Sequence, residues 1–172
     1  MAENASTINW DKSVDILVVG SGNGALTTAL CSHEMGVKDV LVIEKEDQFG
    51  GSSSISGGGV WIPCNRYALE AGAEDSIADA KSYLSSVIPT GTVPEDLIDV
   101  YLAEGPNMVD FLHDHTRVRY ESLAYYPDYY SDAPGARGGH RSMEPAKLNL
   151  SDLGEDWKKL RNTHHMMWLF NR

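Results

Sequence analysis

The sequence predicts an α/β fold that begins with a strand, a helix and a second strand, and three observations lead to this prediction. Residues 14–19 form a short apolar run, mostly β-branched and broken only by Asp15, which is typical of a strand covered on both faces. Residues 20–25 are rich in glycine and lead into a helix expected to end near Met35. Residues 39–43 form a second apolar run. This order of elements is typical of a Rossmann-like βαβ unit.

The glycine turn has the spacing of a dinucleotide-binding fingerprint. Gly20, Gly22 and Ala25 fit the pattern G-x-G-x-x-[GA]. Gly20 permits the tight turn, Gly22 lacks a Cβ and lets a pyrophosphate approach, and Ala25 lets the helix pack on the strand. The helix N-terminus favours the same anion. Glu44 ends the second strand 24 positions after Gly20, where a carboxylate that binds a ribose hydroxyl is expected. The alternative is a plain strand–turn–helix, but the agreement of turn, helix, strand and acid favours a nucleotide.

Charge and composition narrow the class of protein. The chain has 172 residues and a net charge of −11, which argues against a nucleic-acid or anionic-membrane surface. No apolar run approaches the roughly 18 residues of a membrane span, so we expect no transmembrane segment. The N-terminus lacks the basic and apolar regions of a signal peptide. The two cysteines have no metal-ligand spacing and make no disulfide framework, so we expect no metal site and a cytoplasmic location.

Residues 45–63 are rich in glycine and serine, yet they are not a flexible linker. A linker would not carry the apolar side chains Phe49, Ile55, Val60, Trp61 and Ile62. Serine hydroxyls and glycine N–H groups favour the lining of a polar ligand site, and residues 52–54 could cap a short helix that faces the same phosphates. A surface cluster of turns is the alternative.

These motifs together resemble one family of flavoproteins. Gly-Ser-Gly-x-Gly-Ala at 20–25, Glu-Lys at 44–45 and Phe-Gly-Gly-Ser-Ser-x-x-Ser-Gly-Gly-Gly-Val-Trp-Ile-Pro at 49–63 are similar to motifs of the 3-ketosteroid dehydrogenases, which belong to the fumarate-reductase-like superfamily. The resemblance implies that the dinucleotide is FAD. The residues then expected at the pyrophosphate are Gly20, Ser21, Gly22, Asn23, Gly24 and Ala25. Glu44 is expected at the adenosine ribose, and Lys45 is a further cofactor-binding candidate. Those expected on the flavin side are Gly50, Gly51, Ser52, Ser53, Ser54, Ser56, Gly57, Gly58 and Gly59.

Residues 66–117 have helical character. Apolar positions over 74–87 are spaced by three and four residues, and a later helix is expected to start at Pro94. We expect Gly105 and Pro106 to interrupt that helix and a further helix to follow. His113 and His115 near its end have no third ligand nearby, so a solvated helix end is favoured over a metal site.

Residues 118–142 change character. Five of the chain's eight tyrosines fall within residues 120–130, and Pro-Gly and Gly-Gly pairs follow. This pattern predicts a strand that enters a long loop, with an edge strand whose tyrosines cover a core as the alternative.

The family resemblance extends into this stretch. Pro-Asp-Tyr-x-x-x-Ala-Pro-Gly at 127–135 is similar to the Asp-Tyr-His-Pro-Glu-x-Pro-Gly segment of the family, with Tyr130 in place of histidine and Ser131 in place of proline. Tyr129 aligns with an active-site tyrosine of the family and is the one candidate catalytic residue.

The reaction implied by the resemblance is dehydrogenation of ring A of a 3-ketosteroid between C1 and C2. A base removes the C2 proton that the ketone acidifies, hydrogen-bond donors stabilise the enolate oxygen, and flavin N5 accepts hydride from C1. In the family the base is a tyrosine from a later segment, and the tyrosine that matches Tyr129 hydrogen-bonds toward it. A phenol with a pKa of about 10 is a poor base at neutral pH, so such a partner helps it ionise.

Much of the family's fold lies outside these 172 residues. We therefore expect a polar lead-in at 1–13, the first part of an FAD-binding domain at 14–117, and a tyrosine-rich region at 118–172 that a complementary chain completes or that is truncated. That chain would carry the rest of the FAD and cap domains, because a two-stranded sheet is rarely stable alone. The substrate would be a steroid or another small ketone.

Two other functions remain open. The first is another fumarate-reductase-like flavin oxidoreductase, acting on a small enoate or dicarboxylate that Arg137, His140 and Arg141 would clamp. The second is a non-catalytic nucleotide-binding fragment.

Overall fold

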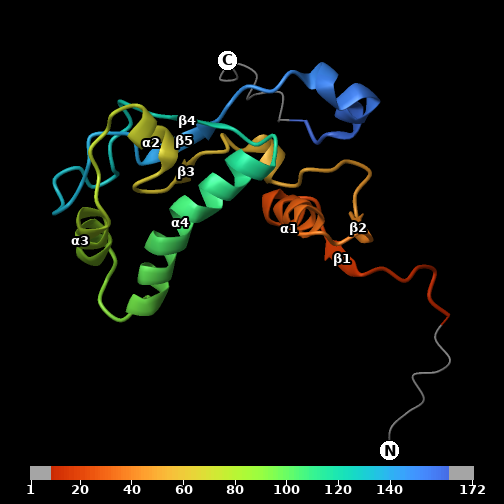
Figure 1. Ribbon diagram of the computed structural model, residues 1–172, viewed down its shortest axis with the longest axis horizontal. Helices are drawn as coiled ribbons and strands as arrows, with labels where there is room; N and C mark the ends of the chain where they lie inside the picture. Colours follow the sequence, from red (N-terminus) through yellow and green to blue (C-terminus); the bar gives the residue numbers. More distant parts are fainter. Residues whose placement is uncertain (1–8, 163–172) are drawn as a thin grey trace, which may run out of the picture. The chain divides into compact units, whose positions relative to one another are not determined.

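The computed structural model describes residues 9–162, which fall into two compact units (Figure 1). Unit 1 comprises residues 1–55 and 155–172, of which 9–55 and 155–162 are described, and unit 2 comprises residues 56–154. Each unit is compact and contains one small β-sheet.

Unit 1 contains the predicted strand–helix–strand unit. Strand β1 (Ile16–Val19) pairs in parallel with β2 (Val40–Ile43), and helix α1 (Asn23–Glu34) connects them and packs on both strands (Figure 1). The register joins Ile16 to Val40, and the Gly20 N–H extends the ladder by donating to the Ile43 carbonyl at 2.7 Å. The predicted β-α-β order is confirmed.

The expected incomplete sheet of two strands is confirmed, and within the described residues it leaves the first strand uncovered on part of its surface. Val18 is buried, but Leu17 is 53% and Val19 is 75% exposed. Within residues 9–162 this sheet has two strands, with α1 packed against it, and these strands lack further neighbours. The described residues therefore leave apolar side chains of β1 exposed to solvent.

In the remainder of unit 1, residues 159–161 are hydrogen-bonded to the glycine-serine segment at Phe49. A short 3₁₀ helix, η2 (Ser53–Ile55), follows Gly50 and Gly51, so a short helix does form here. Ser53 and Ser54, expected to cap it, lie within it. The Phe49 N–H donates to the Lys159 carbonyl and the Arg161 N–H to the Phe49 carbonyl, both at 2.9 Å. The 3₁₀ segment η3 (Leu150–Lys159) is broken by a kink at Gly154, where the two units divide.

Unit 2 has an antiparallel sheet with helices around it. The strands are β3 (Val60–Trp61), β4 (Tyr120–Ser122) and β5 (Ser142–Pro145), in the order β3-β5-β4. The helices are α2 (Arg66–Glu70), α3 (Ile77–Val87) and α4 (Glu95–His115). One buried cluster joins Ile62, Val109 and Met143, and a second joins Ala80, Ile98 and Leu102.

The predicted interruption at Gly105 and Pro106 is wrong, because α4 runs unbroken through both residues. A proline inside a helix costs about 3 kcal/mol. Leu102 and Val109 are buried on either side of it, and a Cβ at Gly105 would lie 3.2 Å from Ile62 Cγ2. Continuous burial of this face and the close approach that glycine allows outweigh the cost of the proline.

The strand and loop predicted after residue 118 are confirmed by β4 and the segment that follows it. The alternative, an edge strand whose tyrosines cover a core, holds for Tyr120 of the edge strand β4, which packs against the cluster of Ile62, Val109 and Met143. It does not hold for Tyr125 and Tyr129, which are 96% and 88% exposed. Strand β5 was not predicted from the sequence. It is short and contains a proline, so it lacks the alternating apolar pattern of a strand.

Other expectations concern metals and membranes. Among residues 9–162 no cluster of three His, Cys, Asp or Glu side chains has the arrangement of a metal site. His113 is half-buried and its Nδ1 is hydrogen-bonded to the Tyr67 hydroxyl at 2.8 Å, so a fully solvated helix end is wrong for this residue. None of the described helices has the length and apolarity needed to cross a bilayer.

Candidate functional site

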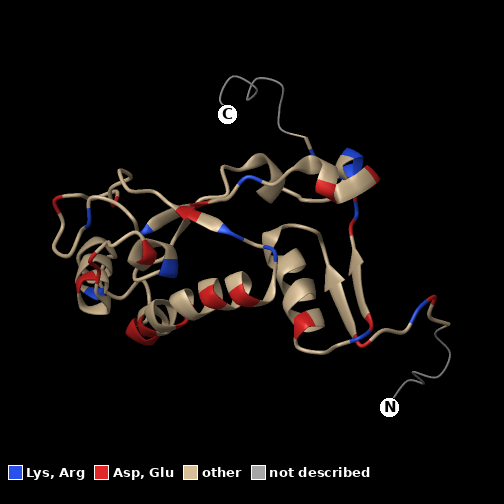
Figure 2. Ribbon diagram, turned by 45° about the horizontal axis from the view of Figure 1, so that its top comes forward, with Lys and Arg blue, Asp and Glu red and all other residues tan. Residues whose placement is uncertain are grey.

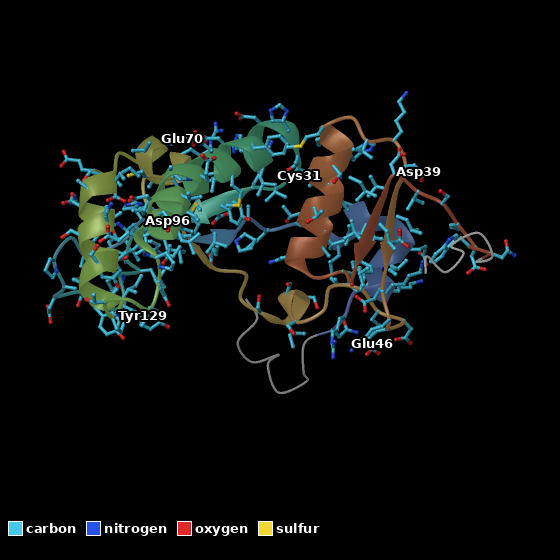
Figure 3. The ribbon with its side chains drawn as sticks, turned by 90° about the horizontal axis from the view of Figure 1, so that it is seen from below. Cys31, Asp39, Glu46, Glu70, Asp96 and Tyr129 are labelled. Atoms are coloured by element: carbon cyan, nitrogen blue, oxygen red, sulfur yellow. The ribbon has the colours of Figure 1, made fainter. Side chains whose placement is uncertain are left out.

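The carboxyl ends of β1 and β2 open into a hollow of about 510 Å³. Ligands of open α/β sheets bind at this edge, and Figure 3 shows Asp39 and Glu46 at the two opposite ends of β2, with Glu46 on the side of the hollow. The lining residues are Val19, Gly20, Ser21, Gly22, Ile43, Glu44, Lys45, Glu46, Gln48, Gly51, Ser52 and Arg161.

The turn between β1 and α1 presents bare backbone to this hollow. Gly20 has a φ of +97°, which glycine adopts without strain. Gly22 is the N-cap of α1, so no side chain caps the helix from that position. The first turn of α1 carries no charged residue (Figure 2). The Asn23 N–H donates to Ser53 Oγ at 3.0 Å, and a Cβ on Gly51 would lie only 3.7 Å from Gly22 Cα. Two glycine segments thus meet at a helix N-terminus, which is an arrangement that suits a diphosphate.

Glu44 is held in the hollow by a set of donors. Ser21 Oγ donates to Glu44 Oε2 and accepts from the Gly50 N–H at 3.0 Å. The N–H groups of Lys45 and Glu46 donate to Glu44 Oε1 at 2.8 and 3.2 Å. The hydrogen bond from Ser21 and that from Glu46 hold the pKa of Glu44 below its ordinary value. The Glu44 side chain therefore favours the ionised form, and it lines the hollow as a hydrogen-bond acceptor.

The structure brings most of the predicted unit 1 residues together. Seven of them line the hollow: Gly20, Ser21, Gly22, Glu44, Lys45, Gly51 and Ser52. Asn23, Ser53 and Gly50 are hydrogen-bonded to this set or to each other, and Ser54 Oγ donates to the Gly51 carbonyl at 3.1 Å. Gly24 and Ala25 lie in the first turn of α1. Sequence reasoning missed Gln48 and Arg161, and Arg161 carries no local signal because it arrives from the far end of the chain.

Unit 2 contains a second hollow, of about 500 Å³, with a largely apolar lining. Its walls come from β3, α3, β5 and the tyrosine-rich loop, and they consist of Gly57, Gly59, Val60, Trp61, Tyr83, Leu84, Leu123, Tyr126, Pro127, Asp128, Tyr129, Ser142, Met143 and Glu144. Three predicted residues, Gly57, Gly59 and Tyr129, are in this set. Two more lie beside it in the chain, where the Gly58 N–H donates to Ser56 Oγ at 3.1 Å. Tyr129 lies on the surface of unit 2 (Figure 3).

A buried ion-pair cluster contributes one residue, Asp128, to the lining of this second hollow. The Arg141 side chain is 2% exposed and pairs with Asp75, 5% exposed, and Asp128, 2% exposed. Arg141 Nη2 and Nε lie 2.7 and 3.0 Å from the two Asp75 oxygens, and Nη1 lies 2.8 Å from Asp128 Oδ2. Trp61 Nε1 donates to Asp128 Oδ1 at 2.6 Å. We call Asp75, Asp128 and Arg141 the buried triad.

Ionisation of the triad is favoured despite its burial. Burial opposes the charge on Asp75, but hydrogen bonds from Arg141 and from the Cys64 N–H outweigh it, so the Asp75 pKa lies below its ordinary value. Burial likewise opposes the charge on Arg141, and the bonds to Asp75 outweigh it, so the Arg141 pKa lies above its ordinary value. Close paired charges with full hydrogen bonding are the condition under which buried ions persist.

The residues considered as clamps for a substrate carboxylate are engaged elsewhere. Arg141 is saturated by the triad, and Arg137 Nη2 donates to Asp79 Oδ2 at 2.6 Å. His140 Nδ1 is hydrogen-bonded to Ser122 Oγ at 2.8 Å. Sequence reasoning found Arg141 but missed its partners, because Asp75 lies 66 positions away along the chain.

Comparison with known proteins decides the family. Residues 15–170 match the FAD binding domain family. The chain belongs to this family. Over 142 residues it is 42% identical to the 3-oxosteroid 1-dehydrogenase of Mycobacterium tuberculosis H37Rv, an alignment that covers 83% of this chain and 25% of the relative. Over 139 residues it is 42% identical to the 4-oxocyclohexanecarboxylate 2-dehydrogenase of Sinomonas cyclohexanicum, with 81% and 24% covered.

A solved structure extends the match to the fold of this FAD binding domain. The 3-ketosteroid Δ1-dehydrogenase of Sterolibacterium denitrificans, solved in complex with 1,4-androstadiene-3,17-dione, aligns with a TM-score of 0.82 at 39% identity. The alignment covers 91% of this chain and 27% of that one. The chain therefore spans about a quarter of the length of the relatives it matches.

Proposed function

We propose that this chain forms the FAD-binding portion of a flavin-dependent 3-ketosteroid dehydrogenase that introduces a C1–C2 double bond into ring A. The observation that carries the proposal is the match, at 39% identity and a TM-score of 0.82, to a solved 3-ketosteroid Δ1-dehydrogenase. The whole enzyme would be an oxidoreductase that acts on a CH–CH bond.

The unit 1 hollow suits the adenosine diphosphate half of FAD. Gly20, Gly22 and Gly51 expose backbone at the N-terminus of α1, where the N-cap residue Gly22 has no side chain and Ser53 Oγ accepts from the Asn23 N–H. Glu44, an ionised acceptor on the rim, would bind the ribose hydroxyls. When bound, FAD supplies the acceptor for the hydride that leaves the substrate.

The unit 2 hollow suits a flat apolar ketone. Its lining is mostly aromatic and aliphatic, and Tyr129 stands at its edge with an exposed phenol. We assign Tyr129 the role of hydrogen-bonding to the base that removes the proton next to the ketone. Such a bond stabilises the phenolate form of a tyrosine base, which otherwise has a pKa of about 10.

Further polypeptide is needed to complete the enzyme in this proposal. Leu17 and Val19 of β1 expose apolar side chains that additional strands or helices would cover, and the phenol of Tyr129 is open. A complementary chain that carries the remaining FAD-binding and cap regions is the proposed partner. Residues 14–117 would belong to the FAD-binding domain and 118–172 to the active-site region. The thiols of Cys31 and Cys64 are unpaired, as a reducing cytoplasm favours, and we propose that compartment.

A smaller cyclic ketone is the second candidate substrate. It is favoured by the 42% identity to a 4-oxocyclohexanecarboxylate 2-dehydrogenase, whose name describes the same bond next to a ring ketone. A dicarboxylate or enoate is less well supported, since Arg137 and Arg141 are already paired with acids of this chain.

The test is turnover by the purified flavoprotein. The chain is prepared alone and with the completing polypeptide, and bound flavin is read from its absorbance. Each preparation is assayed with 4-androstene-3,17-dione, 4-oxocyclohexanecarboxylate and fumarate, with a dye as electron partner. We expect a yellow complex that oxidises the steroid fastest. Flavin binding without oxidation of either ketone would contradict the proposal, and fumarate reduction would support the dicarboxylate alternative.

A further inference from the structure

Tyr129 is held in place by its neighbours in the chain and not by its own side chain. The side chain is 88% exposed, and its hydroxyl makes no hydrogen bond to any other residue in the described range 9–162. On one side of it, Asp128 is buried. On the other side, the Tyr130 N–H donates to the Tyr83 hydroxyl at 3.3 Å. The direction in which the phenol leaves the backbone therefore depends on how firmly these two neighbours are anchored.

Asp128 is anchored by three donors from two segments of the chain, Trp61 in β3 and residues 137–141. Its carboxylate accepts from Trp61 Nε1 at 2.6 Å, from Arg141 Nη1 at 2.8 Å and from the Arg137 N–H at 2.9 Å. Its backbone N–H donates to the Arg137 carbonyl at 2.9 Å, which closes the loop that contains Tyr129. A carboxylate with three converging donors has one orientation, since any rotation of the side chain breaks at least one bond.

Arg141 is in turn immobilised from all sides. Asp75 binds two of its nitrogens in a bidentate pair, and Asp128 binds the third. The guanidinium carbon lies 5.7 and 5.9 Å from the ring centres of Trp61 and Tyr83, and those rings form part of the wall of the hollow. The planar fork of arginine suits this role, because a lysine can offer only a point charge.

We propose that Asp128 and Arg141 are positioning residues for Tyr129, so that the buried triad sets the location of the phenol at the edge of the hollow. This inference rests on the proposed function, in which Tyr129 takes part in proton removal. A misplacement of about 1 Å at such a group can lower the reaction rate by about 100-fold. Loss of Asp128 or Arg141 is therefore expected to lower the rate about as much as loss of the Tyr129 hydroxyl.

A double-mutant cycle on the FAD-loaded enzyme tests the proposal. The variants are Tyr129→Phe, Asp128→Asn and the two combined, and kcat with 4-androstene-3,17-dione is expressed per bound flavin. A variant that only destabilises the fold lowers the amount of enzyme with bound flavin, but it does not lower the turnover rate per bound flavin. We expect each single variant to lower kcat by roughly 100-fold with KM changed less than about threefold, and the double variant to be no slower than Tyr129→Phe.

The outcomes separate this inference from the proposed function. If Tyr129→Phe leaves kcat unchanged, the assigned role of Tyr129 fails and the inference fails with it. If Tyr129→Phe slows the enzyme but Asp128→Asn does not, or if the two losses multiply, the proposed function stands and the positioning role is overturned.

Two further variants guard against misfolding and general damage. Arg141→Lys keeps the charge but cannot bind both acids in the same way, so it enters the same cycle should Asp128→Asn fail to fold. It is expected to lower kcat by more than tenfold in the presence of Tyr129 and not at all in its absence. Asp99→Asn removes the exposed Lys81–Asp99 pair between α3 and α4, neither member of which is hydrogen-bonded to Asp128 or Arg141, and kcat should stay within about twofold. A comparable loss in Asp99→Asn would overturn the inference.

Discussion

Two hollows of similar volume, about 510 and 500 Å³, are built in opposite ways in the two units. In unit 1 the lining is backbone and small side chains at the end of an open two-stranded sheet, and the apolar sides of Leu17 and Val19 are exposed. In unit 2 the wall is largely aromatic and aliphatic, and Asp128 in that wall belongs to a triad of charged side chains that are at most 5% exposed and paired with one another. Backbone N–H groups bind a phosphate wherever a glycine turn leads into a helix N-terminus. A side chain that acts on a reacting bond must instead be held in one position by packing and hydrogen bonds.

The largest expected effect comes from removing the positive charge of the buried triad in unit 2. Arg141→Met leaves the buried side chains of Asp75 and Asp128 without the cation that pairs with both, which costs about 3–5 kcal/mol of unfolding free energy. Urea unfolding of the flavoprotein, followed by tryptophan fluorescence, measures it. The matched control is Arg117→Met, whose pair with Asp152 is exposed and worth less than about 1 kcal/mol. Equal losses in both variants would show that burial of the triad has no energetic consequence.

The next effect concerns the bare backbone of unit 1. Gly22 has an ordinary φ of −72°, so Gly22→Val fits the chain but places a side chain where the diphosphate would approach. Overpacking of this kind costs about 1–3 kcal/mol, so we expect FAD affinity to fall about 10- to 100-fold while the unfolding midpoint of the apoprotein changes little. Flavin fluorescence titration gives the affinity. Gly138→Val, at an open position of unit 2, should bind FAD normally, and a parallel loss there would refute the steric explanation.

A smaller effect is expected at Glu44. Glu44→Gln retains an oxygen to accept from Ser21 but loses the charge that would bind the ribose, so FAD affinity should fall about tenfold. Glu44 is ionised in the wild type because its pKa is lowered from the ordinary value of 4.5. The contribution of Glu44 to FAD affinity is therefore constant above pH 4.5 and declines as the pH falls through the lower pKa of the folded protein. Titrations at several pH values measure both. Affinity that rises toward acid pH would contradict this role.

The smallest effect is the acid sensitivity of unit 2. Folding lowers the Asp75 pKa below its ordinary 3.8, so the folded state favours the ionised form. Its contribution to stability is complete above 3.8 and is lost as the pH falls through the folded value. Asp79, whose pKa is lowered by hydrogen bonds from Ser76 and Arg137, acts in the same direction. Thermal unfolding between pH 6 and pH 3 should show a falling midpoint, with a shallower fall in Asp79→Asn. A midpoint that is flat or rises toward acid would argue against ionised partners for the arginines.

Local sequence was sufficient for the βαβ unit and for the face that a nucleotide would occupy. The positions of Gly20, Gly22 and Glu44 around one hollow follow from nearby chain geometry, because a strand, a turn and a helix bring them together. Local rules failed at Gly105 and Pro106, where burial of α4 on both sides overrides the proline, and at β5, whose pairing with β3 and β4 involves distant segments.

The sequence by itself determined the order of the first strands and helix, the turn that suits a diphosphate, and the resemblance that identifies a flavoprotein. Only the tertiary structure decided what Arg141 does. Its partners Asp75 and Asp128 come from the segment before α3 and from the tyrosine-rich loop, and no spacing along the chain encodes their meeting. In the sequence, Arg141 is a candidate for binding a ligand, but in the fold it is buried beside two acids and stabilises the structure. The reason is that a charged group removed from water remains ionised only when an opposite charge contacts it.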